Sequence, residues 1–390
     1  MNYLKVFSAP MKGSSWMYCP LDGNPDHHDH SDKLEDTVKR RATHTIKRRR
    51  DNLYDVLTTT ACIGLLGLML VLSWDRWKRY EPQIACRDPP QRREWRTLRP
   101  QEQQSYIDAV LCLSDRPSIF EPGSSRFDDM AYLHLNEGTI THYAAAFLPF
   151  HRYFIHIFEK ALGKECGYYG GLPYWDWSLD SSDLALSPIW RDIGGFGGSG
   201  NPDIGEEISG GHCITSGPFA YATRHWKAKW NGNNFEPVAK PHCLSRGFVA
   251  PGADKDDFQK GIAPESLADV LAHPEYDGFL KILEMMSHNS IPQFVQGDFF
   301  LGTAPNDPVF YLHHAQVDRL WWLWQQEDAE HRLYAFQGAA ENQLFGGSNS
   351  SEKASVAASL NDVLTFGRFG DHVQIRDLMR TDTSLLCYKY

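Results

Sequence analysis

The segment Ala304-Pro-Asn-Asp-Pro-Val-Phe-Tyr-Leu-His-His-Ala-Gln-Val-Asp318 combines a helix start with a pair of adjacent histidines. Asn306-Asp-Pro308 predicts the start, because Asp307 can cap a helix and proline is tolerated at the first helical position. The helix would then carry His313 and His314, whose side chains project about 100° apart around its axis. We therefore expect only one of these two histidines to bind a metal strongly.

A second segment, Phe147-Leu-Pro-Phe-His-Arg-Tyr153, follows His134 and His142. His142 and His151 are nine residues apart, which on one continuous helix would place them half a turn out of phase. Pro149 resolves this problem, because proline is well placed in a first helical turn and interrupts whatever helix precedes it. His142 then approaches from a preceding helix end or loop, and His151 from the start of the next helix.

Histidines grouped without carboxylates among them suit copper, which favours neutral imidazole nitrogen. Together with Leu172-Pro-Tyr-Trp-Asp-Trp177, the two segments resemble the tyrosinase family of type 3 copper proteins, from about Cys86 to Tyr390. The resemblance implies a mainly α fold, a four-helix-bundle dicopper core with long loops. It also implies two copper ions with five histidine ligands: His134, His142 and His151 for copper A, and His288 and His314 for copper B.

The copper-B half departs from the family pattern at one position. Family members have a second histidine four residues after the first, whereas this chain has Pro292 four residues after His288. Proline cannot ligate copper. Three outcomes stay open: two histidines with an open or water-filled position, substitution by His313 or Gln293, or a site that is weakened or lost.

Asn289 resembles the family position that helps to orient a water for deprotonation of a phenol, and it is our candidate catalytic residue. A hydrogen bond at a helix end is the alternative role. The glutamate that usually shares the task is not recognisable at its expected distance, where Phe279 stands. The resemblance assigns Asp318 a supporting role one turn beyond His314, as carboxylates that orient imidazoles have. The alternative for Asp318 is an ion pair on the helix surface.

The resemblance implies a copper-dependent oxidoreductase that oxidises o-diphenols to o-quinones with O₂, with prior hydroxylation of monophenols as an extension. The expected substrate is a small phenolic molecule or a tyrosine-containing peptide in pigment or secondary-metabolite biosynthesis. The main alternative, which Pro292 favours, is a copper-deficient or oxygen-binding, non-enzymatic member of the same fold. Another alternative is a membrane-anchored accessory protein that assembles partners through its basic tail.

The composition fits a globular enzyme and argues against nucleic acid as a partner. Of 390 residues, 42% are apolar, which is enough for a buried core. The net charge is −10, while residues 1–50 are positively charged, so the negative charge is concentrated in the rest of the chain. An acidic main domain does not suit a nucleic-acid partner.

Residues 54–75 are predicted to form a transmembrane signal anchor. Residues 56–74 carry no charge, and as a helix they would span roughly 28 Å, about one hydrocarbon core. The residues before this helix are too many for the short, positively charged N-terminal region of a cleaved signal peptide. The basic cluster Lys47-Arg-Arg-Arg50 favours a cytosolic N-terminus. We therefore predict a single-pass membrane protein with a cytosolic polar tail, residues 1–50, and a tyrosinase-like copper domain, residues 85–390, in the secretory lumen or outside the cell.

Six cysteines fall in the predicted copper domain, which suits three disulfides in an oxidising compartment, but fifteen pairings are possible. The triplet Asn349-Ser-Ser351 predicts a glycosylated surface loop.

Residues 187–261 are rich in Gly, Pro and Asn and predict a lid or binding rim with few strands. Helical patterns occur at residues 89–113, 127–136, 149–162, 264–271, 278–287 and 307–326.

Overall fold

The computed structural model describes residues 41, 46–50, 52–54, 56–69, 85–138, 141–231, 235–249, 255–342 and 356–390. The chain divides into two units, Met1–Pro82 and Gln83–Tyr390. Most of the predicted cytosolic tail and the predicted glycosylation site at Asn349 lie outside the described residues.

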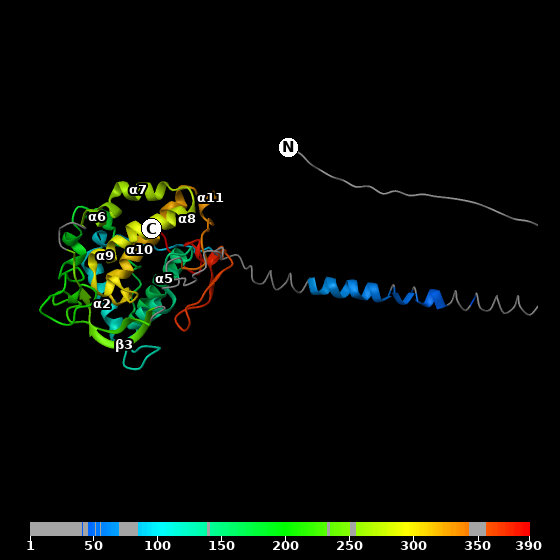
Figure 1. Ribbon diagram of the computed structural model, residues 1–390, viewed down its shortest axis with the longest axis horizontal. Helices are drawn as coiled ribbons and strands as arrows, with labels where there is room; N and C mark the ends of the chain where they lie inside the picture. The colour runs from blue at the N-terminus through cyan, green and yellow to red at the C-terminus, as the bar shows by residue number, and fades with distance from the viewer. Residues whose placement is uncertain are drawn as a thin grey trace, which may run out of the picture. The chain divides into compact units, whose positions relative to one another are not determined.

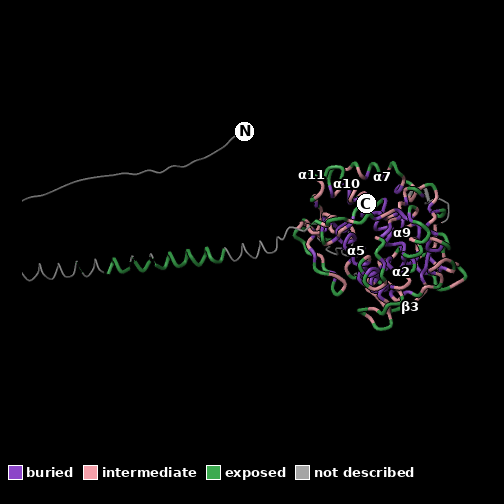
Figure 2. Tube along the Cα trace, turned by 180° about the vertical axis from the view of Figure 1, so that it is seen from behind, coloured by how far each residue is buried: buried purple, intermediate pink, exposed green. Residues whose placement is uncertain are grey.

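The first unit contains an apolar helix, Ile46–Met69, which is blue in Figure 1. The helix has 24 residues and is long and apolar enough to cross a membrane, a test that a signal sequence also passes. Its described side chains are exposed, as the green trace in Figure 2 shows, and include the free cysteine Cys62. A helix therefore exists where the membrane anchor is predicted, and membrane insertion stays a prediction.

The second unit is mainly helical. Its helices are α2 (Pro100–Asp115), α3 (Asp128–Leu133), α5 (Phe147–Cys166), α6 (Lys255–Ile262), α7 (Pro264–Ala272), α8 (Tyr276–Ile282), α9 (Asn289–Val295), α10 (Val309–Glu327) and α11 (Ala329–Arg332). Two π-helical turns, η2 (His134–Gly138) and η6 (Leu283–His288), continue α3 and α8. Short 3-10 segments are η1 (Trp95–Thr97), η3 (Trp177–Asp180), η4 (Leu184–Leu186), η5 (Pro188–Trp190), η7 (Gly297–Phe300), η8 (Ala304–Asn306) and η9 (Ile375–Leu378).

The described strands form three two-stranded antiparallel sheets. They pair β1 (His212–Cys213) with β4 (Ser245–Arg246), β2 (Thr223–Trp230) with β3 (Phe235–Cys243), and β5 (Val363–Leu364) with β6 (Val373–Gln374). The β2–β3 hairpin lies inside the region predicted to be poor in strands. The sequences of these two strands do not alternate regularly between apolar and polar residues, so they do not predict long strands.

The two helices that carry the quoted segments begin as their sequences predict. Pro149 lies in the first turn of α5, and the helix ends at Gly167, whose φ of 70° gives a left-handed cap. Pro308 is the N-cap residue of α10, and Asp307 before it accepts, at Oδ1, a hydrogen bond of 2.9 Å from the backbone N–H of Val309, the first residue of the helix. The helix predicted from residue 89 begins later, at Pro100, after the short segment η1.

Packing of α5 against α10 and α2 builds the core of the second unit, and the purple trace in Figure 2 runs through these helices. Arg152 of α5 and Asp318 of α10 form a fully buried ion pair of 2.5 Å. The Arg152 guanidinium lies over the buried ring of Trp321, 3.6 Å from its centroid, and Trp324 of the same helix is also buried. These large rings are part of the apolar core of the second unit.

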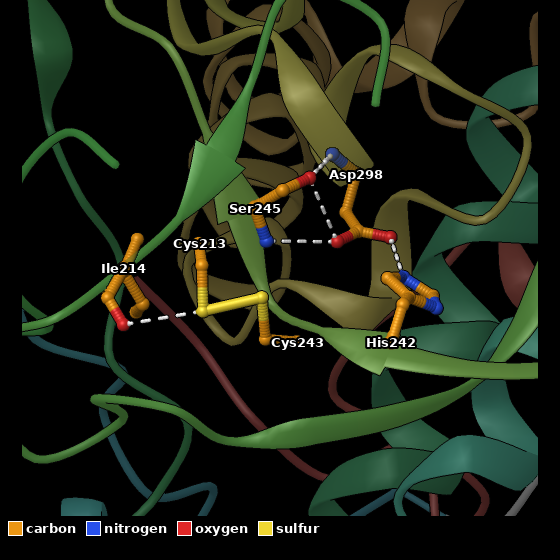
Figure 3. The surroundings of a disulfide bond; sticks show 6 residues. All are labelled: Cys213, Ile214, His242, Cys243, Ser245 and Asp298. Atoms are coloured by element: carbon orange, nitrogen blue, oxygen red, sulfur yellow. Dashed lines mark hydrogen bonds and ion pairs between the residues drawn. A yellow bond between two sulfur atoms is a disulfide. The ribbon is translucent and has the colours of Figure 1, made fainter. Parts of the chain in front are cut away.

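Three disulfides join the six cysteines of the second unit: Cys86–Cys387, Cys112–Cys166 and Cys213–Cys243. The second of them ties α2 to the last residue of α5, and the third ties β1 to β3, as Figure 3 shows. The prediction of three disulfides is thereby confirmed, and tertiary structure selects one pairing out of fifteen.

Candidate metal centre

Six histidines of the second unit form two groups. The first histidine group consists of His134, His142 and His151, and the second consists of His288, His313 and His314. Within each group, one ring nitrogen from each residue lies within 4.8 Å of the others. The structure thus brings together all five predicted ligands and adds His313.

Two of the histidines sit on π-helical turns. His134 begins η2 and His288 ends η6, where the widened turn redirects side chains that an α-helix would point elsewhere. His142 lies in the turn before α5, as predicted from Pro149. Gly138 is the last residue of η2 and lies directly against the His134 ring. A Cβ added at this position would be only 2.9 Å from the Cδ2 atom of that ring.

Every ring of the first histidine group donates its Nδ1–H to a backbone carbonyl. The acceptors are Gly302 for His134 at 2.7 Å, Gly138 for His142 at 2.7 Å and Phe147 for His151 at 2.8 Å. These bonds fix the tautomer and leave each Nε2 with a free lone pair. The Nε2 atoms of His134 and His151 are 3.2 Å apart, a separation that suits two ligands about 2 Å from one ion.

Burial keeps the first histidine group neutral. Desolvation, followed by the neighbouring ring of His142, lowers the pKa of His134 to about 3 and holds that of His151 well below its usual value. Desolvation also lowers the pKa of His142. Since only neutral imidazole has a lone pair for a metal, the group is ready to bind one at neutral pH.

The second histidine group is less completely hydrogen-bonded. His288 donates its Nδ1–H to Asn289 Oδ1 at 2.9 Å, which frees its Nε2. Within the described part of the chain, His314 Nδ1 has no partner, and His313 has none at either nitrogen. The ring centroids of His313 and His314 each lie 5.0 Å from that of His288. Desolvation lowers the pKa of all three rings.

The two histidine groups face each other. The rings of His151 and His314 stack with centroids 4.1 Å apart and planes at 9°, and His142 lies 6.0 Å from His288 between centroids. Two metal ions held by these groups would be close neighbours, as two-metal catalytic sites require. Neutral, buried imidazoles with free nitrogens are the donors that copper prefers, so the residues present fit a copper pair.

A cavity of about 310 Å³ opens onto both groups. Phe299 and Phe310 give it apolar walls, Pro292 and Asn289 of α9 line it, and Phe235 of β3 reaches it from the hairpin. The contribution of Phe235 agrees with the prediction of a binding rim in residues 187–261. The volume suits a small aromatic molecule.

The backbone carbonyl of Gly302, which accepts the His134 hydrogen bond, lies in a loop after η7. A buried carboxylate in η7 anchors this loop. Asp298 at the start of η7 accepts hydrogen bonds from His242 Nε2 at 2.8 Å, from the backbone N–H of Ser245 at 2.9 Å and from Asn306 Nδ2 at 2.9 Å. Burial alone would raise the pKa of Asp298, but His242 and the other donors outweigh it and lower the pKa. Figure 3 shows this carboxylate beside the Cys213–Cys243 disulfide, which stiffens the strands that supply the donors.

Asn289 lies in the cavity wall and has two partners. Its Oδ1 accepts from His288, and its side chain is also hydrogen-bonded to the hydroxyl of Tyr143. Tyr143 follows His142 and has a φ of 54°, a left-handed conformation that a tyrosine adopts only under local constraint. The hydrogen bond at a helix end that was the alternative role of Asn289 is therefore present, and it orients a histidine.

Glu284 is a buried carboxyl beside the second histidine group along the chain, and it was not predicted from the sequence. It lies four residues before His288, is buried, and accepts the backbone N–H of Tyr143 at 2.9 Å. Desolvation raises the pKa of Glu284 to about 8. Phe279, which occupies the position expected for the family glutamate, is a core residue stacked on Trp324. The four-residue spacing to His288 was the signal that could have found Glu284.

The predicted role of Asp318 as a carboxylate that orients His314 is wrong. Its Oδ atoms accept from Arg152 Nε at 2.5 Å and from the hydroxyls of Tyr388 and Tyr390 at 2.5 and 2.6 Å. The alternative of a surface ion pair is wrong too, because Asp318 is buried. Asp318 instead joins α5, α10 and the C-terminal segment behind the site.

Comparisons with known proteins agree with this site. The sequence model described as the common central domain of tyrosinase matches residues 124–327. The chain is 40% identical to the tyrosinase-like protein phomQ1 of Diaporthe leptostromiformis over 388 residues, which cover 96% of this chain and 98% of that protein. It is 35% identical to tyrosinase ustQ of Aspergillus flavus over 390 residues, which cover 97% of this chain and 98% of that protein.

Among solved structures, a polyphenol oxidase variant from Thermothelomyces thermophila superposes with a TM-score of 0.64 at 28% identity. The match covers 82% of this chain and 93% of the polyphenol oxidase chain. With the mostly helical core and the two facing histidine groups, these similarities show that the chain belongs to the tyrosinase family of copper oxidoreductases.

Proposed function

We propose that this protein is a dicopper oxidase that converts o-diphenols to o-quinones with O₂. His134, His142 and His151 are the proposed ligands of copper A, and His288 and His314 are proposed ligands of copper B. The observation that carries the proposal is the stack of His151 on His314, which places two groups of neutral imidazoles face to face.

Bound copper would supply the redox chemistry, accepting electrons from the phenol and passing them to O₂. In balance, two diphenols and one O₂ give two quinones and two waters, so each ring loses two protons and two electrons. The protein residues bind and orient the ring in a site from which Phe299 and Phe310 exclude water. The cavity of about 310 Å³ supports a small phenolic substrate, and a tyrosine side chain of a peptide has the same chemistry.

Asn289 is the proposed residue that holds the reacting hydroxyl. Its side chain is already hydrogen-bonded to a phenol, that of Tyr143, at the edge of the cavity. A substrate hydroxyl that takes the place of the Tyr143 hydroxyl would be held beside His288. Hydroxylation of a monophenol would in addition need a proton acceptor, and Glu284 on the preceding turn could take this role only above about pH 8, because burial raises its pKa to about 8 and keeps the carboxyl protonated below that pH.

The proposed setting is a single-pass membrane protein with the copper domain in the secretory lumen or outside the cell. The apolar helix Ile46–Met69 and the three disulfides support it, because disulfides persist in oxidising compartments. A protease-protection assay on membranes, with analysis of glycosylation at Asn349, tests the orientation. A degraded, unglycosylated domain on the cytosolic side would contradict it.

The similarity to fungal tyrosinases supports a role in secondary metabolism.

The function is tested on the full chain by copper analysis, by the near-ultraviolet absorption of the oxygenated protein, and by oxidation of a simple catechol. We expect two copper ions per chain and turnover, and we expect His151→Ala to abolish both the absorption band and turnover. His156→Gln is the matched control, because His156 is a buried histidine of the same helix that belongs to neither group. Its variant should keep both properties.

The second candidate function is a copper-deficient or oxygen-binding member of the family without enzymatic activity, and Pro292 is the residue that favours it. Copper loading that leaves the chain with at most one ion and no turnover supports this alternative over the oxidase. Two ions with a reversible absorption band but no catechol oxidation would identify an oxygen-binding protein.

A further inference from the structure

Pro292 faces the site from the position where a histidine ligand of copper B is missing. It lies inside α9, four residues after His288, and it lines the cavity together with His288 and His314. Residues four apart on a helix project from the same face. The departure from the family pattern therefore lies at the metal site itself, and the pyrrolidine ring offers no lone pair there.

His313 is the residue with unused donors next to this gap. Its side chain has no exposed surface, and neither of its nitrogens has a hydrogen-bond partner in the described part of the chain. Buried polar groups are nearly always paired, because an unpaired one costs stability. An imidazole in this state points to a partner that is not a protein side chain.

The geometry of the second histidine group also fits one ion. One ring nitrogen of His313 lies within 4.8 Å of a nitrogen of His288 and of His314, and its ring centroid is 5.0 Å from both rings. The planes of His313 and His314 are inclined at 76°, and the two rings still bring one nitrogen each into the same group. Rotation about the side-chain bonds thus lets both rings reach one group, although neighbouring helix positions project about 100° apart.

Gln293, the other substitute considered from the sequence, is less well placed. The residues of α9 that line the cavity are Asn289 and Pro292. The backbone carbonyl of Gln293 accepts a hydrogen bond from the side chain of Gln296, which ties this end of α9 to the following turn. His313 is also the better donor for copper, which favours imidazole over amide oxygen.

We propose that His313 is the third protein ligand of copper B and replaces the ligand lost at Pro292. This inference rests on the proposed dicopper function. Copper B is then held by His288 from η6 and by two adjacent histidines of α10.

The test compares four full-length proteins: wild type, His313→Gln, the double variant Pro292→His/His313→Gln, and His156→Gln as the control. Copper per chain and the electron paramagnetic resonance signal of the oxidised protein are measured, since a coupled pair of Cu(II) ions gives no signal and an isolated ion does. We expect two ions and no signal for wild type and His156→Gln. We expect His313→Gln to lose one ion and show the signal of a single Cu(II).

The double variant separates a lost ligand from a damaged fold. Restoration of two ions and a silent spectrum by Pro292→His would support the ligand role, because the variant returns an imidazole to the position four residues after His288. Retention of two coupled ions by His313→Gln would overturn the role of His313 and leave the dicopper function standing. Fewer than two ions in the wild type after copper loading would overturn the dicopper function, and the inference with it.

Discussion

The rings of His151 and His314 stack with their centroids 4.1 Å apart, although one comes from the start of α5 and the other from the middle of α10. Each is followed by a residue of the same buried ion pair, Arg152 directly after His151 and Asp318 four residues after His314. The spacing between the two histidine groups is therefore set by the packing of these helices, and it responds to residues that touch no metal.

Replacement of Asp318 by Asn should destabilise the second unit strongly. The change leaves the buried guanidinium of Arg152 without its counter-charge, which typically costs about 3–5 kcal/mol. Urea unfolding of the metal-free protein measures this loss. Asp277→Asn is the control, because its ion-pair partner Lys281 is exposed and Asp277 is only partly buried, and such surface pairs typically contribute about 0–1 kcal/mol. Equal effects of the two changes would contradict the role of Asp318 as a buried anchor.

Substitution of Gly138 by Ala should weaken copper A without unfolding the protein. The new Cβ would lie 2.9 Å from the His134 ring, so this ring must move away from the point where the Nε2 atoms converge. We expect the affinity for copper A to fall by roughly 10- to 100-fold, as is typical when a residue that positions a metal ligand is lost. Competition with a chelator measures it. Gly198→Ala, whose Cβ would have its nearest neighbour at 3.9 Å, should bind copper normally.

Asn289→Ala should affect copper B and substrate binding together. It removes the acceptor that fixes the Nδ1–H of His288 and the partner of the Tyr143 hydroxyl. Copper B should bind roughly 10-fold or more weakly, and with copper restored at saturation the KM for a catechol should still be raised. Asn136→Ala is the control, because Asn136 is exposed and bonds only the backbone of its own helix among the described contacts. An unchanged KM would argue against contact between Asn289 and substrate.

Glu284 should make the stability of the metal-free protein depend on pH. Burial raises its folded pKa to about 8, from an ordinary value of 4.5, so the folded state holds a proton that the unfolded state releases. Its contribution is fully present below about pH 4.5 and is lost as the pH rises through about 8. Glu284→Gln should therefore gain stability relative to wild type between these limits, by several kcal/mol at the upper end. Unfolding curves at several pH values give the difference, and a constant difference would contradict the raised pKa.

Comparison with wild type at each pH is needed because the histidines act in the opposite direction. Desolvation holds the pKa of His134 and His288 at about 3, below the ordinary value of 6.5. Their contribution to stability is present above about pH 6.5 and is lost as the pH falls toward 3. Both proteins share this effect, so it cancels in the difference.

Much of the site could be predicted from local sequence signals. Pro149 and Asp307 mark the starts of α5 and α10, and their effects depend only on nearby backbone geometry. The spacing of His142 and His151 then places them on different elements that converge. By contrast, the pattern before His288 predicted an ordinary helix, whereas a π-helical turn forms there, because the hydrogen-bond register of a helix responds to what packs against it.

The sequence by itself determined the family, the first histidine group and the position of the gap at Pro292, because these depend on residue type and spacing along the chain. Only the tertiary structure decided which histidine lies beside that gap, which cysteines pair and what Asp318 binds. These are contacts between segments far apart in the sequence, and they form when burial brings side chains together and leaves few partners for each polar atom. His313 is identified by such a shortage: it is fully buried, and within the described residues neither of its nitrogens has a partner.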